Sequence, residues 1–584
     1  MMKEIKQINL TIDNKLISVD EGTTVLEAAR KLGIDIPTLC FLKDINEIGA
    51  CRMCLVEVEG ARGFVTSCVY PVTEGMVVRT NTKDLLDTKK TVLELILSNH
   101  EKACLTCSRS LNCELQSLCR KFGIEEIEYV GCMTEKTIDN TSASIVRNTA
   151  KCILCKRCVN VCRKVQNVSA IDVMHRGFKS KIGVALNMSI GDSTCVGCGQ
   201  CIVNCPVAAL QEKDNILDLK KALNDKDKVV IIQTAPAVRA TIGEEFGMPI
   251  GSLVTGKMVN GLKMLGFNKV FDTDLAADVT IMEEGTEFLS RVNNKGVLPM
   301  ITSCSSGWIT YAEKFYPDLL GHLSTTKSPM EIMGILIKKY YADKMNIDAK
   351  NIYSVALMPC SAKKTEIIRD ELLVDGMQVI DNVITTREMA RLLKENNIDL
   401  FNLEDVEYDN PLGIATGAGH IFGITGGVME AALRTVYEMI TNKRLDKIEF
   451  EEVRSTEGIK EAVIDIDGLK VNIAVAQGLK NACKLMDEIK EGKSKYHFIE
   501  IMTCPGGCIM GGGQPIHNSY IKSKVDVRKL RANALYTADK NSKYRISKDN
   551  PLIKTIYDEF LGLPNGEVAH KLSLIHISEP TRPY

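Results

Sequence analysis

Cysteine dominates the residues of this chain that could do chemistry. The sequence of 584 residues contains 22 cysteines, and most of them stand in CxxC groups. Thiolates are soft ligands that bind zinc and iron-sulfur clusters. In a reducing compartment such groups do not pair as disulfides, so their spacing predicts metal ligation.

The sharpest pattern is a pair of four-cysteine runs. The second run, followed by Pro206, fits the bacterial ferredoxin pattern CxxCxxCxxxCP, and the first repeats the spacing with Arg163 in place of the proline. In such ferredoxins the fourth cysteine of each run serves the other cluster. We therefore expect two 4Fe-4S clusters, one on Cys152, Cys155, Cys158 and Cys205 and the other on Cys195, Cys198, Cys201 and Cys162. Zinc is the alternative, but zinc ligands usually form two CxxC pairs separated by a longer gap.

Two further groups precede these runs. The first consists of Cys40, Cys51, Cys54 and Cys68. It resembles a 2Fe-2S site, although the plant-type spacing is not kept and zinc remains an alternative. The second consists of His100, Cys104, Cys107 and Cys113, and its spacing suits either zinc or a 4Fe-4S cluster with one imidazole ligand. The neighbouring ferredoxin runs favour iron at both groups, because zinc would add nothing to an electron path. The remaining Cys119, Cys132 and Cys483 match no ligand spacing and receive no role.

Small modules are expected to position these cysteines. Residues 1–82 alternate between short apolar strands around one helix, which predicts a small α+β module of the β-grasp 2Fe-2S type. Residues 83–123 have a helical pattern and hold the His/Cys group. Residues 142–215 are short segments around the two ferredoxin runs. The fold class expected for this half is thus a string of small iron-sulfur modules.

Residues 228–571 have a different sequence pattern, in which predicted strands alternate with predicted helices. The strand-like runs are 229–233, 269–273, 298–302, 353–358 and 498–502. Alternating βα units predict an α/β domain of parallel or mixed sheets flanked by helices, with ligands at the carboxyl ends of the strands. Cys304, Cys360 and Cys504 each follow such a strand, so we expect them to converge on one site. Ser328 and Pro329 predict the start of a helix.

Charge and the chain ends limit the partners. The 73 basic and 74 acidic residues give a formal net charge of -1, so no global field favours nucleic acid or an anionic membrane. The first residues lack the apolar core of a secretory signal, and no later run is long enough to cross a bilayer. These features predict a cytoplasmic protein. Residues 572–584 resemble a translated sequencing adapter and are expected to be an artefactual tail.

Three loops carry a resemblance to a known family. ITSCSSGW (301–308), MPCSAKKTE (358–366) and MTCPGGCIMGGGQP (502–515) strongly resemble the signature loops of FeFe-hydrogenases. The order of the modules is also similar to that family, up to about Lys571. The resemblance implies reversible oxidation of H2 and reduction of protons, with electrons from a soluble ferredoxin or flavodoxin, and maturation proteins that deliver a diiron unit.

The resemblance also implies the cofactors. The family's H-cluster joins a 4Fe-4S cubane through a cysteine sulfur to a diiron unit with CO, cyanide and a dithiolate amine. Cys360 and Cys504 would ligate the cubane, Cys508 would bridge it to the diiron unit, and Lys363 would donate to a cyanide. The residues expected to lie against the diiron unit are Met358, Met502, Phe422 and Pro236. One 2Fe-2S and three accessory 4Fe-4S clusters complete the set.

A proton path is the last feature that the resemblance implies. It runs through Cys304, Glu284, Ser324, Glu287 and Arg291. Glu284 and Glu287 lie three residues apart on a predicted helix and so share a face, which without the resemblance would be read as a solvated surface.

Four positions depart from the family pattern. Ser305 stands where the family has a cubane ligand and Ser306 where proline is usual; Ala237 replaces a serine and Met330 a polar amide. Either Ser305 ligates weakly or Cys304 is recruited. The departure at Ser305 leaves open a sensor or electron-transfer protein without a diiron unit. The N-terminal modules leave open a subunit of a larger bifurcating complex, which shares them. The glycine-rich stretch at 413–434 does not fit a dinucleotide motif and is expected to pack closely near the cofactor.

Overall fold

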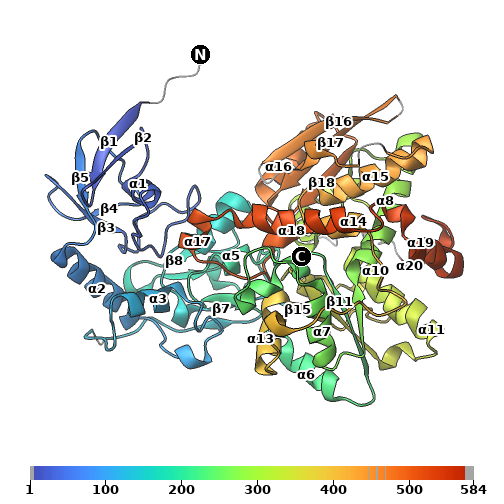
Figure 1. Ribbon diagram of the computed structural model, residues 1–584, viewed down its shortest axis with the longest axis horizontal. Helices are drawn as coiled ribbons and strands as arrows, with labels where there is room; N and C mark the ends of the chain where they lie inside the picture. The colour runs from blue at the N-terminus through green and yellow to red at the C-terminus, as the bar shows by residue number, and fades with distance from the viewer. Residues whose placement is uncertain (1–5, 130, 446–447, 455–457, 467, 573–584) are drawn as a thin grey trace.

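The computed structural model describes residues 6–129, 131–445, 448–454, 458–466 and 468–572. Figure 1 shows the N-terminal modules as one lobe and the α/β domain as a larger lobe beside it. Helix α17 (Ser519–Lys524) lies where the two lobes meet, and α18 (Val527–Asn541) continues from it across the larger lobe (Figure 1). Within the described part of the chain, no helix combines the length and the apolar character needed to span a membrane.

The first module is a mixed five-stranded sheet with one helix. Its strand order is β2-β1-β5-β3-β4, and only the β1/β5 pair is parallel. The elements are β1 (Gln7–Ile12), β2 (Lys15–Asp20), α1 (Val25–Lys31), β3 (Leu55–Val58), β4 (Val65–Thr66) and β5 (Met76–Arg79). Thr24 and Glu27 form a capping box that fixes the start of α1. The predicted α+β module is confirmed.

Two further modules follow. The helical one contains α2 (Lys83–Ser98), the 3-10 turn η1 (Cys104–Thr106) and α3 (Glu114–Lys121). The two-cluster module has an antiparallel sheet of order β10-β7-β6 and a hairpin of β8 and β9. Its elements are β6 (Ile138–Asp139), β7 (Ile145–Asn148), α4 (Arg157–Asn160), β8 (Asp172–Met174), β9 (Lys181–Gly183), α5 (Gln200–Val203) and β10 (Leu210–Glu212). Both short helices carry cysteines of the ferredoxin runs.

The large domain contains two four-stranded sheets. The first is fully parallel, in the order β12-β11-β14-β15, and the second, β13-β18-β17-β16, is parallel except for the β16/β17 pair. The strands are β11 (Val229–Thr234), β12 (Lys269–Asp272), β13 (Met300–Ile301), β14 (Ile352–Met358), β15 (Asn382–Thr385), β16 (Ile459–Ile466), β17 (Leu469–Gln477) and β18 (Phe498–Met502). All five predicted strands are present, and the α/β prediction is confirmed.

Helices cover these sheets and bury apolar cores against them. The main ones are α6 (Ile216–Asn224), α7 (Thr255–Met264), α8 (Thr273–Asn293), α9 (Ser306–Phe315), α10 (Pro329–Ile335), α12 (Lys363–Glu366), α13 (Thr386–Glu395), α14 (Gly417–Ile421), α15 (Gly427–Thr441), α16 (Leu479–Lys490), α19 (Pro551–Ile556) and α20 (Glu567–Leu572). One apolar cluster surrounds the first sheet, and another fills the space between α8, α15 and the second sheet.

Two sequence predictions need correction in detail. Ser328 and Pro329 do begin α10, but the Ser328 side chain makes no capping hydrogen bond, because its hydroxyl donates to the Glu366 carboxylate instead. Leu572, the first residue of the predicted tail, ends α20 and is 7% exposed. The fold therefore extends one residue into that segment, and residues 573–584 lie outside the described part.

Candidate functional site

Three loops from two sheets meet at one buried site. Lys363, after β14, donates through Nζ to the backbone oxygen of Cys304, after β13, at 3.3 Å. The hydroxyls of Ser305 and Thr503 lie 2.8 Å apart, which joins the β13 and β18 loops. The Gly513 N–H donates to Pro359 O at 2.8 Å. The predicted convergence of the three cysteine loops is thereby confirmed.

Four cysteines from these loops lie close enough to influence one another's ionisation. The pKa of Cys508 is raised to about 12, first by burial and then by the nearby Cys360. Burial and then Cys360 and Cys508 raise the pKa of Cys504 in the same way. Burial, followed by Glu284 and Cys508, raises the pKa of Cys304. Metal binding would replace the thiol protons and relieve this penalty.

Glycines let the loops close around the site. A Cβ on Gly512 would lie 2.5 Å from Cys198 O and 2.7 Å from Gly199 Cα, and one on Gly513 would lie 2.8 Å from Thr385 Cβ. Only glycine fits such close backbone approaches. Nearby, Gly423 faces Leu535 and Ala237 at similarly short distances, so the glycine-rich stretch serves packing, as predicted.

The predicted shell residues are buried or half-buried, and two of them pack near Cys304. Met502 and Phe422 are buried in the apolar cluster that contacts Cys304, and Met358 is buried two residues before Cys360. Pro236 is half-buried just beyond the carboxyl end of β11.

Lys363 is held by a carboxylate that sequence reasoning missed. Its ammonium lies 2.9 and 2.7 Å from the two Glu366 oxygens, and Glu366 also accepts from Ser306 and Ser328. Burial lowers the pKa of Lys363, but Glu366 outweighs this and the net pKa is raised. The ammonium therefore stays charged beside Cys304 and Cys360. The three-residue spacing from Lys363 was the available signal for Glu366.

Glu284 lies near Cys304 and Glu287 follows it on α8, but neither Glu284 carboxylate oxygen has a hydrogen-bond partner among the described residues. Glu284 is 1% exposed and Glu287 is 8% exposed, so they are not a solvated helix face. The Ser324 hydroxyl donates to Glu287 at 2.9 Å, and Arg291 pairs with Glu287 at 2.6 Å. The pKa of Glu284 is raised to about 8, first by burial and then by the neighbouring Glu287. Glu284 is thus a carboxylic acid at neutral pH, poised to exchange a proton.

Glu500 is a second carboxylate that the sequence did not reveal. It lies fully buried on β18, and its oxygens accept from the N–H groups of Gly426 and Met429, each at 2.7 Å, at the start of α15. Burial raises its pKa to about 7. Its charge acts on both Cys304 and Cys508. The only sign of Glu500 in the sequence is that it is the one charged residue in the apolar run FIEIM.

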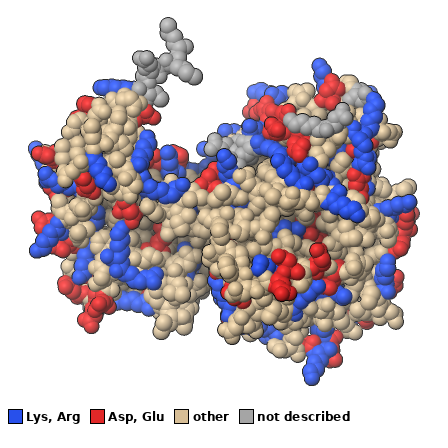
Figure 2. Space-filling view, viewed as in Figure 1, with Lys and Arg blue, Asp and Glu red and all other residues tan. Residues whose placement is uncertain are grey.

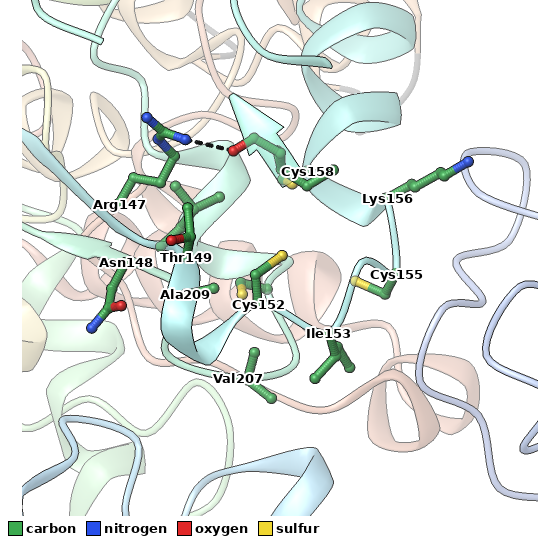
Figure 3. Close-up of a pocket in the computed structure, with 13 residues that line it drawn as sticks. Arg147, Asn148, Thr149, Cys152, Ile153, Cys155, Lys156, Cys158, Val207 and Ala209 are labelled. Atoms are coloured by element: carbon green, nitrogen blue, oxygen red, sulfur yellow. Dashed lines mark hydrogen bonds between the residues drawn. The ribbon is translucent and has the colours of Figure 1, made fainter. Parts of the chain in front are cut away.

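The cysteines of the two ferredoxin runs lie in two groups of four, and each group contains one cysteine from the other run, as expected from the spacing. Cys152, Cys155, Cys158 and Cys205 line one cavity, and in Figure 3 the labelled sulfurs of the first three point into it. Cys198, Cys195 and Cys162 all lie near enough to Cys201 to raise its pKa beyond the effect of burial. Cys158 also neighbours Cys201, and Cys504 neighbours Cys198. The two thiol groups are therefore adjacent to each other, and the second is adjacent to the three-loop site.

The N-terminal cysteines form two pairs. Cys54 Sγ lies 3.3 Å from Cys68 Sγ, and the Cys40 and Cys51 thiols form the other hydrogen-bonded pair. Two pairs suit two iron ions that each take two thiolates. One tetrahedral zinc would hold all four sulfurs about 3.8 Å apart, given a Zn–S distance of about 2.3 Å.

No cysteine group in the described residues is that compact. The single group of three or more metal-ligating side chains there with all ligand atoms within 4.8 Å consists of Asp272, Asp274 and His420. Arg239 Nη2 already pairs with Asp272 at 2.6 Å and Asp274 at 3.2 Å, which balances their charge.

His100 has the properties of a metal ligand. It is buried, and its Nδ1 has no hydrogen-bond partner among the described residues. Burial lowers its pKa to about 4, so the imidazole is neutral and free to bind a metal. Cys104 is exposed, and Cys107 and Cys113 are half-buried.

Comparisons with known proteins agree with this geometry. The model for "Iron only hydrogenase large subunit, C-terminal domain" matches residues 228–512. NADP-reducing hydrogenase subunit HndD of Solidesulfovibrio fructosivorans is 46% identical over 98% of this chain and 99% of its own length. The chain belongs to the FeFe-hydrogenase family. Iron hydrogenase 1 of Clostridium pasteurianum is 42% identical over 96% of this chain and 98% of its own. The structure of a variant of [FeFe]-hydrogenase HydA1 from Chlamydomonas reinhardtii superposes with a TM-score of 0.55 at 39% identity, over 62% of this chain and 98% of that one.

Other family models match the remaining modules of this hydrogenase. They describe a 2Fe-2S iron-sulfur cluster binding domain (5–83), an iron-sulfur binding region of NADH-ubiquinone oxidoreductase-G (89–128), a 4Fe-4S dicluster domain (151–209) and an iron hydrogenase small subunit (525–576). The last covers α18, α19 and α20, which sequence reasoning had merged with the catalytic domain.

This hydrogenase departs from the family pattern at Ser305. The residue is the N-cap of α9, and its hydroxyl accepts from the Thr503 N–H at 3.3 Å in addition to its contact with the Thr503 hydroxyl. The Ser305 hydroxyl therefore ties the loop that carries Cys304 to the loop that carries Cys504.

Proposed function

We propose that Cys360, Cys504 and Cys508 hold an H-cluster in this hydrogenase, which oxidises H2 and reduces protons. The cluster, when bound, supplies the metal chemistry that splits and forms H2. The observation that carries the proposal is the convergence of three thiol-bearing loops, closed by glycines, beside buried carboxylates. Soft thiolates suit iron, and the Lys363 ammonium suits an anionic ligand such as cyanide. Met358, Met502, Phe422 and Pro236 keep the site dry.

In this proposal the chain's own residues move the proton. Cys304 exchanges it with Glu284, whose raised pKa of about 8 lets it act as both donor and acceptor near neutral pH. The Ser324 hydroxyl, bonded to Glu287, continues the path, and Arg291 anchors Glu287 where the path approaches the surface. If each group gives up one proton as it accepts another, no buried side chain has to hold a lasting charge.

The accessory sites would carry electrons. The proposed set is one 2Fe-2S cluster on Cys40, Cys51, Cys54 and Cys68, one 4Fe-4S cluster on His100, Cys104, Cys107 and Cys113, and the two crossed ferredoxin clusters. Asn46 supports their order, because its Nδ2 donates to Cys40 O at 2.6 Å and to Cys155 O at 3.0 Å. The adjacency of Cys158 to Cys201 and of Cys198 to Cys504 supports the remaining steps.

The electron partner has two candidates. A soluble ferredoxin or flavodoxin is one, in a cytoplasmic setting that keeps the thiols reduced and supplies the maturation proteins. The second is a larger complex in which this chain is the hydrogenase subunit. It is favoured by the similarity to a protein named as a subunit of an NADP-reducing hydrogenase. Co-purification with a flavin-binding subunit would support the second candidate.

An anaerobic assay after maturation tests the catalytic proposal. The wild type is expected to turn over H2 in both directions and to show infrared bands from bound CO and cyanide. Cys508→Ala is expected to lose both, whereas the exposed and unassigned Cys132→Ala keeps both. A wild type that carries these bands but shows no turnover in either direction would contradict the proposal.

A further inference from the structure

A groove of about 460 Å³ separates the N-terminal module from α17. Its walls come from segments at opposite ends of the chain, and α17 lies beside α1 in Figure 1. The lining residues are Glu27, Arg30, Lys31, Phe41, Leu42, Lys43, Ser519, Lys522, Ser523 and Lys524. Lys524 Nζ donates to Arg30 O at 2.9 Å, and the hydroxyls of Thr38 and Ser519 lie 3.3 Å apart. The groove is therefore a formed feature with both walls tied together.

The groove is strongly basic in a chain that is nearly neutral. Five of its residues are cationic, namely Arg30, Lys31, Lys43, Lys522 and Lys524, and one, Glu27, is acidic. The Glu27 carboxylate is already paired with Lys43 at 3.0 Å. The whole chain has a formal net charge of -1, so the positive charge here is a local concentration. Figure 2 shows Lys and Arg side chains at the notch between the two lobes.

Apart from Lys43, none of these cations forms an ion pair with another described residue, although Asp35 and Glu27 act on Arg30 and Glu114 acts on Lys522. The Arg30 Nε is buried and has no hydrogen-bond partner among the described residues, and the guanidinium stacks on the Phe41 ring at 5.1 Å. The pKa of Lys522 is lowered to about 8, chiefly by burial; the nearby Glu114 opposes this, and Arg157 and Arg531 add to it. The groove thus has positive potential that an external acidic group would neutralise.

The floor of the groove borders two proposed clusters. Phe41 and Leu42 directly follow Cys40, and Ser519 accepts from Arg157 Nη2 at 3.4 Å, next to Cys158. Asn46 bridges the backbone oxygens of Cys40 and Cys155 beneath it. Because electron transfer weakens steeply with distance, a redox group seated in this groove would be well placed for exchange with either cluster.

We infer that this groove is the docking site of an acidic electron-carrier protein whose redox centre lies at its surface. The inference rests on the proposed electron path and adds the surface by which electrons enter or leave it. Acidic residues around the carrier's redox centre would meet Arg30, Lys31, Lys43 and Lys524, which steers the encounter and fixes its orientation. A ferredoxin and a flavodoxin share this chemistry, and the experiment uses one of each.

The test compares charge reversal in the groove with charge reversal elsewhere. The groove variant combines Lys31→Glu, Lys43→Glu and Lys524→Glu in the matured full-length enzyme. The matched control combines Lys480→Glu, Lys484→Glu and Lys490→Glu, three exposed lysines of α16 on the catalytic lobe. H2 oxidation is followed with an acidic two-cluster ferredoxin, with a flavodoxin and with methyl viologen, a small cationic dye. Binding of a redox-inert gallium-substituted ferredoxin is measured by calorimetry, which needs no turnover.

The groove variant is expected to have a KM for the protein carriers that is higher by roughly tenfold or more. This KM should also depend less on ionic strength than that of the wild type. The groove variant's methyl viologen rate stays within about twofold of the wild type, and the control variant keeps wild-type values throughout. Equal carrier KM values in the groove and control variants would overturn the inference, as would a wild type that binds no acidic carrier. If the viologen rate falls too, calorimetry decides, since unchanged ferredoxin affinity would refute docking here. Absence of viologen turnover in the wild type would instead count against the proposed catalytic function.

Discussion

Glu284, Glu500 and His100 owe their protonation states to burial. Removal from water disfavours the charged form, so it raises the pKa of Glu284 to about 8 and of Glu500 to about 7 but lowers that of His100 to about 4. The same cause makes two carboxyl groups able to hold protons and one imidazole able to bind metal. Residue type alone does not reveal these states.

Replacing Glu284 with glutamine should interrupt the proton path. Glu284→Gln keeps the size of the side chain but removes the exchangeable acid, so we expect turnover to fall by about 10²- to 10⁴-fold in both directions. Iron content and the CO and cyanide bands should be unchanged. The exposed Glu404→Gln is the control and should keep full activity.

The pH dependence of Glu284 protonation follows from the direction of its pKa shift. The folded pKa of Glu284 is above its ordinary value, so the group is protonated below about pH 8 and ionised above it. Difference infrared spectra should show a carboxylic acid C=O band that is lost as the pH rises through about 8 and is absent from Glu284→Gln. A band that disappears near the ordinary pKa of about 4.3 would contradict the structure.

Ser305→Cys should strengthen the hold on the cubane. A thiolate in place of the Thr503-bonded hydroxyl completes four soft ligands, so iron loss to a chelator should slow by roughly tenfold. The control Ser290→Cys adds a thiol on the exposed side of α8. Equal rates of iron loss in the wild type and Ser305→Cys would show that the fourth position does not limit cluster retention.

The sequence predicts those parts of the site that depend on residues close together in the chain. It does not predict those that depend on contacts between distant segments. Cysteine spacing is local, so the thiols that line the cavities were predicted, including the crossing of Cys205 to the first run. Glu366 and Glu500 were missed because their roles come from the segments packed against them: Ser306 and Ser328 in one case, the start of α15 in the other.

At the scale of elements, strand ends and glycines position the chemistry. Parallel strands bring their carboxyl ends to one edge, which is why β13, β14 and β18 deliver their cysteine loops together. Strand periodicity predicted this, but it could not predict that the strands divide between two sheets. The helix at Ser328 was predicted correctly, whereas the hydroxyl's bond to Glu366 depends on a segment far along the chain.

Gly512→Ala should weaken the junction between the ferredoxin module and the catalytic loops. The added Cβ would meet Cys198 O at 2.5 Å and Gly199 Cα at 2.7 Å, so one loop must move away at a cost of about 1–3 kcal/mol. We expect the accessory clusters to be reduced normally by dithionite, as seen by electron paramagnetic resonance, while their re-oxidation by protons slows. Gly63→Ala, where a Cβ meets nothing within 4 Å, should leave both rates unchanged. Equal re-oxidation in the two variants would mean that the close approach does not matter for electron flow.

At the scale of the whole molecule, two kinds of stabilisation coexist. The catalytic lobe has extended apolar clusters around both sheets. The module at 142–215 consists of short strands and one-turn helices whose buried residues include several cysteines. Composition and spacing predicted this division into modules. Composition and spacing did not predict how the modules contact one another. Arg157 and Glu114, for example, form an ion pair although they are far apart in the sequence.

Removing iron should therefore unfold the molecule unevenly. Where cluster ligands make up part of the buried core, as in the module at 142–215, cluster binding is part of the folding free energy. Amide hydrogen exchange on the chelated protein should show lost protection at α4, α5 and β7, whereas β11, β14 and α8 stay protected by their apolar packing. The module at 6–82 is intermediate, because its sheet and α1 have an apolar core of their own. Uniform loss of protection across both lobes would show that the clusters stabilise the whole fold cooperatively, and uniform retention would show that they are dispensable for it.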